Sequence, residues 1–170
     1  MSKPESYRNQ KLPEYIERLK NMVVRNFEIM IKPVDSVITE DKFYNILKGR
    51  KMAAEQSIWG AKKVDSCYKE LNRLNENELS SYYRETIPEL IKNLKIMFEL
   101  NLDVIDIELD DGEDGITDDK LHNVIKSRKV GAEDSEWALM KIDELETELN
   151  SKEEDNMKVS WAIKGLVNEE

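Results

Sequence analysis

An apolar stripe from Phe43 to Leu71 is the feature that most limits what this chain can fold into. Apolar residues recur through this segment at α-helical spacing, and Thr39 before it is a favourable N-cap, followed by two acidic residues that suit a positive first turn. The sequence therefore predicts one long amphipathic helix that ends near Leu74. Placing residues at 100° intervals gathers one broad face: Phe43, Ile46, Leu47, Ala54, Ile58, Ala61, Val64, Tyr68 and Leu71.

Two glycines lie inside this predicted helix. Gly49 and Gly60 each cost up to about 1 kcal/mol relative to Ala. They fall on one side of the helix together with Ala53, and a line of small residues lets another helix approach closely. A break of the helix at either glycine is the alternative interpretation.

Other segments also carry helical patterns. One runs from Pro13, which suits a first-turn position, to about Lys32. The next opens with a capping box, Thr86-Ile-Pro-Glu89, and we expect it to form a hairpin with the long helix. Thr117 then predicts the cap of a helix that Gly131 ends. Two C-terminal helices follow, from Asp134 to about Leu149 and from a second capping box at Ser151 to Val167.

Composition agrees with a helical fold, because the 170 residues include only six Gly and four Pro. The predicted fold class is mainly α, a helical hairpin or bundle with a long central amphipathic helix. We expect the bundle core over residues 1–102, an acidic, linker-like segment over 103–119, and a C-terminal helical region over 120–170.

The charges are divided unevenly between the two halves. Residues 1–75 hold 15 Lys/Arg and 10 Asp/Glu, whereas residues 76–170 hold 11 and 26. In 103–119 there is no basic residue, and from Asp103 to Leu109 apolar and acidic residues alternate as in an extended segment. The acids before Gly115 are only partly like an EF-hand loop, because its twelfth position would be Leu121 instead of Glu. An acidic, solvated turn is the favoured interpretation.

The residues that usually carry catalysis are scarce. His122 and Cys67 are the only residues of their kinds, and neither phosphate-binding glycine pattern occurs. Glu14-x-x-Glu17 and Glu133-x-x-Glu136 are spaced to chelate Mg²⁺, but such pairs are common on solvated helices. The sequence therefore predicts a protein that is not an enzyme and has no cofactor and no metal site.

The chain also lacks signals for membranes or export. No apolar stretch approaches the roughly 20 residues of a membrane span, and the N-terminus lacks the apolar core of a signal peptide. A single cysteine agrees with a reducing compartment. We therefore expect a cytoplasmic protein that does not contact membranes.

One side of the long helix is basic. Its lysines and arginine are spaced by near-whole helical turns and extend over about 33 Å, about one turn of duplex DNA. A net charge of −10 opposes long-range attraction to nucleic acid, so phosphate binding is not favoured. This possible phosphate-binding ridge consists of Lys48, Lys51, Lys62, Lys69 and Arg73.

The function predicted from the sequence is that of an intracellular adaptor, assembly or regulatory protein that presents an acidic surface to a basic protein partner. Trp59 lies toward solvent on the long helix and is the candidate interface aromatic. Long amphipathic helices also favour a homo-oligomer, and an acidic face over 133–155 adds to the negative side. The candidate acidic surface consists of Asp103, Asp106, Glu108, Asp110, Asp111, Glu113 and Asp114.

Two alternative functions remain open at this point. One is an accessory protein of nucleic-acid metabolism, such as a viral DNA packaging or transcription cofactor, that uses the basic ridge. The other is an acidic mimic of nucleic acid that inhibits a DNA- or RNA-binding protein.

Overall fold

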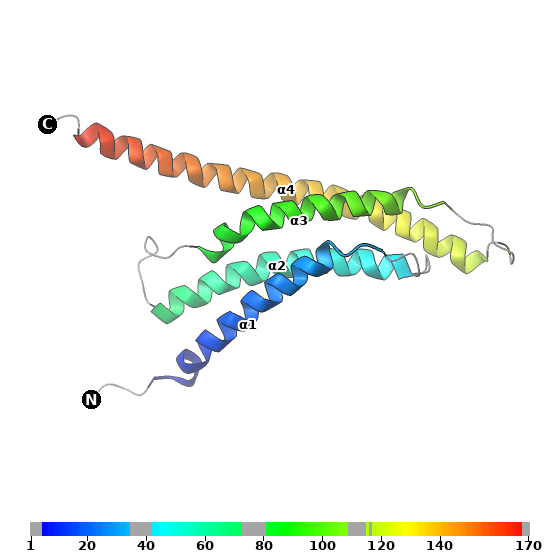
Figure 1. The fold of residues 1–170 in the computed structure, drawn as a ribbon, viewed down its shortest axis with the longest axis horizontal. Coiled ribbons are helices and arrows are strands. Elements are labelled where there is room, and N and C mark those ends of the chain that lie inside the picture. Colours follow the sequence, from blue (N-terminus) through cyan, green and yellow to red (C-terminus); the bar gives the residue numbers. More distant parts are fainter. Residues whose placement is uncertain (1–4, 35–41, 73–80, 109–114, 116, 168–170) are drawn as a thin grey trace.

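The computed structural model describes residues 5–34, 42–72, 81–108, 115 and 117–167, with the backbone alone for Asn72 and 152–167. This part of the chain folds into four helices and contains no strand. The mainly α, helical-bundle prediction is confirmed (Figure 1). The helices are α1 (Tyr7–Met30), α2 (Phe43–Asn72), α3 (Tyr82–Ile105) and α4 (Asp118–Val167).

Helices α1 and α3 both begin earlier than predicted, because a serine caps each of them. Ser6 Oγ accepts a hydrogen bond from the Asn9 amide at 3.2 Å, and Ser81 Oγ accepts one from the Arg84 amide at 3.0 Å. The prediction that α1 starts at Pro13 and that a capping box at Thr86 opens α3 is therefore wrong. Both helices continue through an exposed proline, Pro13 or Pro88.

The long central helix is confirmed as α2, which is unbroken at both glycines. A Cβ on Gly60 would lie 3.0 Å from Met22 Cε and 3.0 Å from Val23 Cγ2, so this glycine allows α1 to approach closely. A Cβ on Gly49 would meet nothing within 4 Å. The predicted cap, Thr39, lies outside the described residues.

Helix α4 is one continuous helix of 50 residues. Its predicted cap is confirmed, since Thr117 Oγ1 accepts a hydrogen bond from the Lys120 amide at 3.2 Å. The predictions of a stop at Gly131 and of a separate last helix from Ser151 are wrong. Gly131 is an internal residue of α4, where an added Cβ would lie 3.3 Å from the Asn101 carbonyl oxygen of α3. Close contact between α3 and α4 therefore explains this glycine better than the end of a helix does.

The extended segment predicted from Asp103 is also wrong in its first part. Helix α3 includes Asp103 and ends at Ile105, and residues 106–108 form no strand. The alternation of Ile105, Ile107 and Leu109 with acids has the two-residue period of a strand. In the structure Ile105 is the last residue of α3, a helix whose buried residues include Asn101 and Val104, and Ile107 lies just beyond it; Leu109 is outside the described residues.

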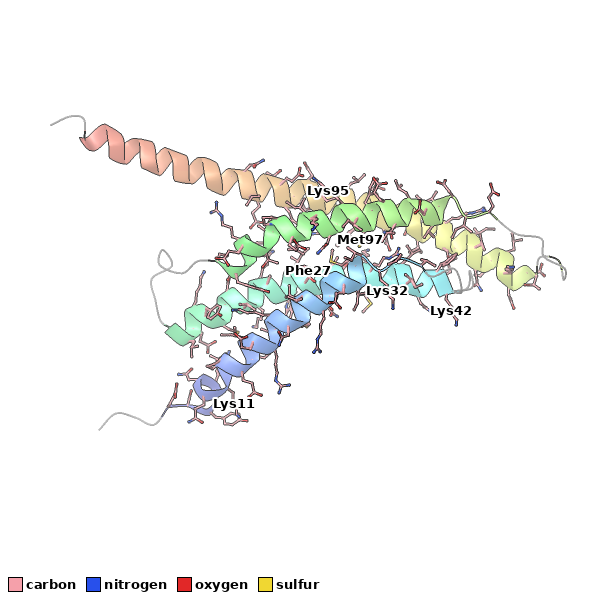
Figure 2. All side chains as sticks on the ribbon, in the orientation of Figure 1. Lys11, Phe27, Lys32, Lys42, Lys95 and Met97 are labelled. Atoms are coloured by element: carbon pink, nitrogen blue, oxygen red, sulfur yellow. The ribbon has the colours of Figure 1, made fainter. Side chains whose placement is uncertain are left out.

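The core lies between the helices, and the cation of Arg50 is buried in it. Met97 is fully buried and Phe27 packs against the same cluster, whereas Lys11 is exposed (Figure 2). Arg50 is only 1% exposed, and its Nη1 donates to Asn101 Oδ1 at 3.0 Å. Its Nε and Nη2 donate to the Lys32 carbonyl oxygen at 3.2 and 2.7 Å. Arg50 thus joins α2 to α3 and to the segment that follows α1.

The two helical hairpins are copies of each other. Residues 39–72 aligned with 117–150 are identical at 16 of 34 positions, and residues 6–31 aligned with 81–106 are identical at 9 of 26. The first pair is related by a shift of 78 residues and the second by a shift of 75. The chain therefore contains an internal duplication, which we call the first hairpin (α1 and α2) and the second hairpin (α3 and α4 as far as Asn150).

The structure repeats the same contacts in both copies. Arg128 is the equivalent of Arg50, and Ile107 is the equivalent of Lys32. The guanidinium of Arg128 donates from Nε to the Ile107 carbonyl oxygen at 2.9 Å, and its Nη2 donates to the same oxygen. Each arginine therefore holds the chain where it leaves the first helix of its own hairpin.

The hairpins are stacked in an open arrangement. Helix α2 contacts both α3 and α4, and α3 contacts α1, but α1 and α4 do not touch within the described residues. A two-fold axis between the hairpins would make the α1–α4 contact equal to the α2–α3 contact, so their relation is head to tail. Helices α1 and α4 therefore form the two ends of the stack (Figure 1).

Candidate functional site

The acidic segment is described only in part. Asp103, Asp106 and Glu108 are exposed at the end of α3 and just beyond it. The other four members of the predicted acidic surface, Asp110, Asp111, Glu113 and Asp114, lie outside the described residues. The described acids therefore lie exposed at the C-terminal end of α3.

The basic ridge lies largely beside the second hairpin. Lys51 Nζ lies 3.9 Å from Asp134 Oδ1 and 5.5 Å from the centre of the Trp137 ring. Lys62 Nζ lies 5.1 Å from the centre of the Tyr83 ring. Lys48, Lys62 and Lys69 are exposed, and Arg73 lies outside the described residues. The middle of the ridge thus contacts α3 and α4, which leaves less of it open to a phosphate backbone.

A groove between α2 and α4 surrounds the buried carboxyl of Asp134. The groove has a volume of about 420 Å³, and the Asp134 side chain is 7% exposed. Burial raises the pKa of Asp134, and the nearby Lys51 ammonium opposes this shift. The Oδ2 atom has no hydrogen-bond partner within the described residues. The lining residues are Tyr44, Lys48, Lys51, Met52, Glu55, Val130, Glu133 and Asp134.

The chemistry of this groove is limited. Within the described residues, no three His, Cys, Asp or Glu side chains are grouped so that they could hold a metal ion. Cys67 is buried elsewhere, and burial raises the pKa of its thiol, which disfavours the reactive thiolate. The acid in the groove is therefore placed to neutralise Lys51 at the junction of the hairpins.

The exposed side of α4 forms an acidic surface with apolar residues in its middle. Leu139 and Met140 are each 50% exposed. Within the described part of the chain, Glu136 and Asp143 beside them form no ion pair, whereas Glu133 pairs with Lys129 on the same helix at 3.8 Å. We call this the α4 outer surface; it consists of Ala132, Glu133, Glu136, Leu139, Met140 and Asp143.

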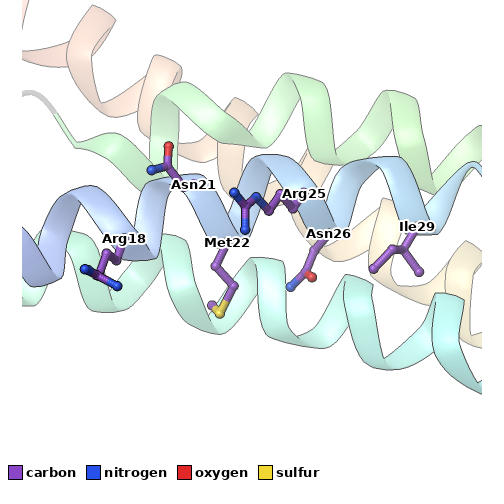
Figure 3. Close-up of a pocket in the computed structure, with 6 residues that line it drawn as sticks. All are labelled: Arg18, Asn21, Met22, Arg25, Asn26 and Ile29. Atoms are coloured by element: carbon purple, nitrogen blue, oxygen red, sulfur yellow. The ribbon is translucent and has the colours of Figure 1, made fainter.

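The opposite end of the stack carries a basic surface on α1. Tyr15 is 40% and Ile29 is 44% exposed. Arg18 and Ile29 line a groove of about 640 Å³, in which Met22 and Asn26 point toward α2 (Figure 3). Arg8 is paired with Glu70, and Arg18 with Glu14 at 3.0 Å. We call this the α1 outer surface; it consists of the exposed residues Arg8, Lys11, Tyr15, Arg18 and Ile29.

Trp59 is 53% exposed, as its helical position predicts. Its equivalent in the second hairpin, Trp137, instead packs against the core and lies near Lys51. Helical periodicity alone does not identify the α1 outer surface, because several of its members have the charge of ordinary solvent-facing residues. Alignment of the chain with itself supplies the missing signal, since the equivalent residues of α3 are buried.

Comparison of the chain with protein-family models, with curated proteins and with solved structures finds no match to any of them. Among the helices of the described ranges, none combines the length and the apolar character that crossing a membrane requires. The functional argument therefore depends on the surfaces themselves.

Proposed function

We propose that this protein is a non-catalytic adaptor or assembly protein that binds a basic protein partner through the α4 outer surface. The observation that carries the proposal is the exposure of Leu139 and Met140, 50% each, among acids that include Glu136 and Asp143. Apolar side chains at the centre of a charged surface are the usual composition of a protein interface. A basic partner would gain both apolar contact and charge complementarity there.

The nucleic-acid alternatives receive less support from the geometry. Lys51 and Lys62, at the middle of the basic ridge, contact Asp134 and Tyr83 of the second hairpin. An acidic mimic would need negative charges that follow the spacing of phosphates, whereas Leu139 and Met140 place apolar area among the acids. A protein surface satisfies this mixture better than a nucleic-acid-binding groove does.

A photo-crosslinking residue at Met140, introduced in the native host, tests the proposal. After nuclease treatment we expect position 140 to crosslink to a protein with a basic surface, and the additional change Asp143→Lys should reduce this product at least about tenfold. A matched probe at Val24, which is 54% exposed on α1, should give no such product. Loss of the product on nuclease treatment would instead support the nucleic-acid alternative, and equal products from both positions would reject the proposal.

A further inference from the structure

The interface between the hairpins is built from α2. Asp65 Oδ2 accepts from Ser81 Oγ at 2.7 Å, and its Oδ1 accepts from the Tyr82 amide at 2.7 Å, so Asp65 caps α3. Arg50 donates to Asn101 farther along the same interface. Between these two contacts, Ala54 and Ala61 are fully buried. One side of α2 therefore holds the second hairpin from the start of α3 almost to its end.

The equivalent side of α4 has no second hairpin to hold. Asp143 is the equivalent of Asp65 and is exposed. Leu139 is the equivalent of Ala61; it is 50% exposed, whereas Ala61 is 0% exposed. The α4 outer surface is thus the same interface as on α2, copied by the duplication and left uncovered within this chain.

The α1 outer surface is the uncovered copy of the surface that α3 presents to α2. Tyr15 is 40% exposed, whereas its equivalent Leu90 is fully buried. Arg18 is exposed, whereas its equivalent Asn93 is 2% exposed. The same contrast holds at the other members of the surface, since Arg8, Lys11 and Ile29 are exposed and their equivalents Tyr83, Thr86 and Val104 are buried.

From this correspondence we infer that the α4 outer surface binds the α1 outer surface of a second copy of this chain, head to tail. The inference deepens the proposed function, on which it rests, by naming the basic partner. Three acids of the α4 outer surface, Glu133, Glu136 and Asp143, would meet three bases of the α1 outer surface, Arg8, Lys11 and Arg18. The arrangement continues an interface that the chain already forms between its own hairpins.

Each contact of the internal interface predicts one between copies. Asp143 caps α1 of the second copy at Ser6, as Asp65 caps α3 at Ser81. Arg128 reaches Asn26 of the second copy, as Arg50 reaches Asn101. Glu136 lies between these two anchors, on the stretch of the facing α1 that carries Arg18. Because both ends of the assembled pair stay open, further copies add until a ring closes or a filament forms.

Sedimentation of the full-length chain over a range of concentrations tests this inference. We expect the wild-type mass to exceed that of a monomer and to fall as salt screens the facing charges. Leu139→Lys blocks one end and Tyr15→Lys the other, and each should weaken association at least about tenfold. Val24→Lys is the matched control and should associate as the wild type does, because its equivalent in α3, Glu99, is exposed.

Mixing the two blocked variants supplies the decisive result. Each variant keeps the end that the other lacks, so an equimolar mixture should form a 1:1 dimer that does not grow further. This gain also shows that both variants are folded. A wild-type chain that stays monomeric at every concentration, or a mixture no heavier than its components, would overturn the inference.

The two proposals fail in distinguishable ways. A monomeric wild-type chain whose position 140 crosslinks to a different protein would overturn head-to-tail assembly and leave the proposed function standing. Self-association without any crosslink from position 140 would overturn both the use of the α4 outer surface and the proposed function.

Discussion

At the scale of single residues, Arg50 shows how a charge can serve the core. Its guanidinium is almost completely buried, yet within the described residues it bonds to no carboxylate; its acceptors are the Lys32 carbonyl oxygen and the Asn101 amide oxygen. Burial lowers the pKa of Arg50, and the nearby Asp103 opposes this shift. Hydrogen bonds from its three nitrogens to these two oxygens offset part of the cost of removing the charge from water.

Arg50→Met should therefore destabilise the fold strongly. The change leaves the buried Asn101 amide oxygen and the Lys32 carbonyl oxygen without their donor, which costs about 2–4 kcal/mol in the free energy of unfolding. Urea unfolding followed by circular dichroism measures this difference. The control Lys69→Met, at an exposed lysine of the same helix, should change the free energy by less than about 0.5 kcal/mol. Equal effects of the two changes would contradict the structural role of Arg50.

Asp134→Asn should stabilise the protein at neutral pH. Because burial raises the pKa of Asp134 in the folded state, the ionised carboxyl costs stability once the pH rises through that pKa. Below the unfolded pKa of about 3.9 the carboxyl is protonated in both states and the cost is absent. The gain from Asn should therefore be present at pH 7 and disappear as the pH falls toward about 4.

Free energies of unfolding of the wild type and of Asp134→Asn, measured across this pH range, test whether the change stabilises the protein at neutral pH. Glu99→Gln removes an exposed carboxyl on α3 and should give no comparable pH-dependent gain. A benefit of Asp134→Asn that grows as the pH falls would show that the Lys51 attraction outweighs the cost of burial.

At the scale of elements, the two glycines of α2 differ in how closely another helix packs against them. Gly60 faces Met22 and Val23 at a distance that leaves no room for a relaxed Cβ, whereas Gly49 faces open space. The equivalent of Gly60 in α4 is the fully buried Ala138. The spacing between the paired helices therefore differs between the hairpins at this point.

Gly49→Ala should stabilise α2 by about 0.5–1 kcal/mol, because it removes backbone freedom from the unfolded chain at no steric cost. Gly60→Ala should give no such gain and should cost about 1 kcal/mol, because the new methyl group displaces Met22 and Val23. Thermal and urea unfolding of the two variants compare them directly. Equal stabilisation by both would show that α1 can move away from α2 freely.

At the scale of the whole molecule, the long α4 exceeds the duplicated unit. Its equivalence to α2 ends at Asn150, while the helix continues to Val167. At 1.5 Å per residue, α4 is about 75 Å long and the 24-residue α3 about 36 Å, so α3 covers only part of it. Figure 1 shows the end of α4 projecting beyond α3.

Hydrogen exchange should reveal this difference within one helix. Amides of residues 151–167 should exchange fastest in α4, because helical hydrogen bonds open readily where no neighbouring helix packs against them. Residues 131–149, which face α3, should be protected at least about a hundredfold more. Mass spectrometry of exchanged peptides measures both segments in the same sample, and uniform protection along α4 would contradict the arrangement.

The sequence by itself determined the properties that depend on neighbouring residues. The apolar stripe of α2 and the N-cap at Thr117 could be read directly, because helical period and cap chemistry are local. The exposure of Trp59 followed from the same period. Even the duplication is present in the sequence, although helical periodicity alone does not display it.

Only the tertiary structure decided the features that depend on distant segments. Gly131 stays helical because α3 lies against it, and Arg50 is buried because α3 and the segment after α1 supply acceptors around it. Lys51 and Lys62 lie beside residues of the second hairpin because the two hairpins pack against each other. The α1 and α4 outer surfaces are open only because the stack ends there, and local sequence holds no information about where packing stops. Burial and long-range contact set these features, and neither is a property of a single helix.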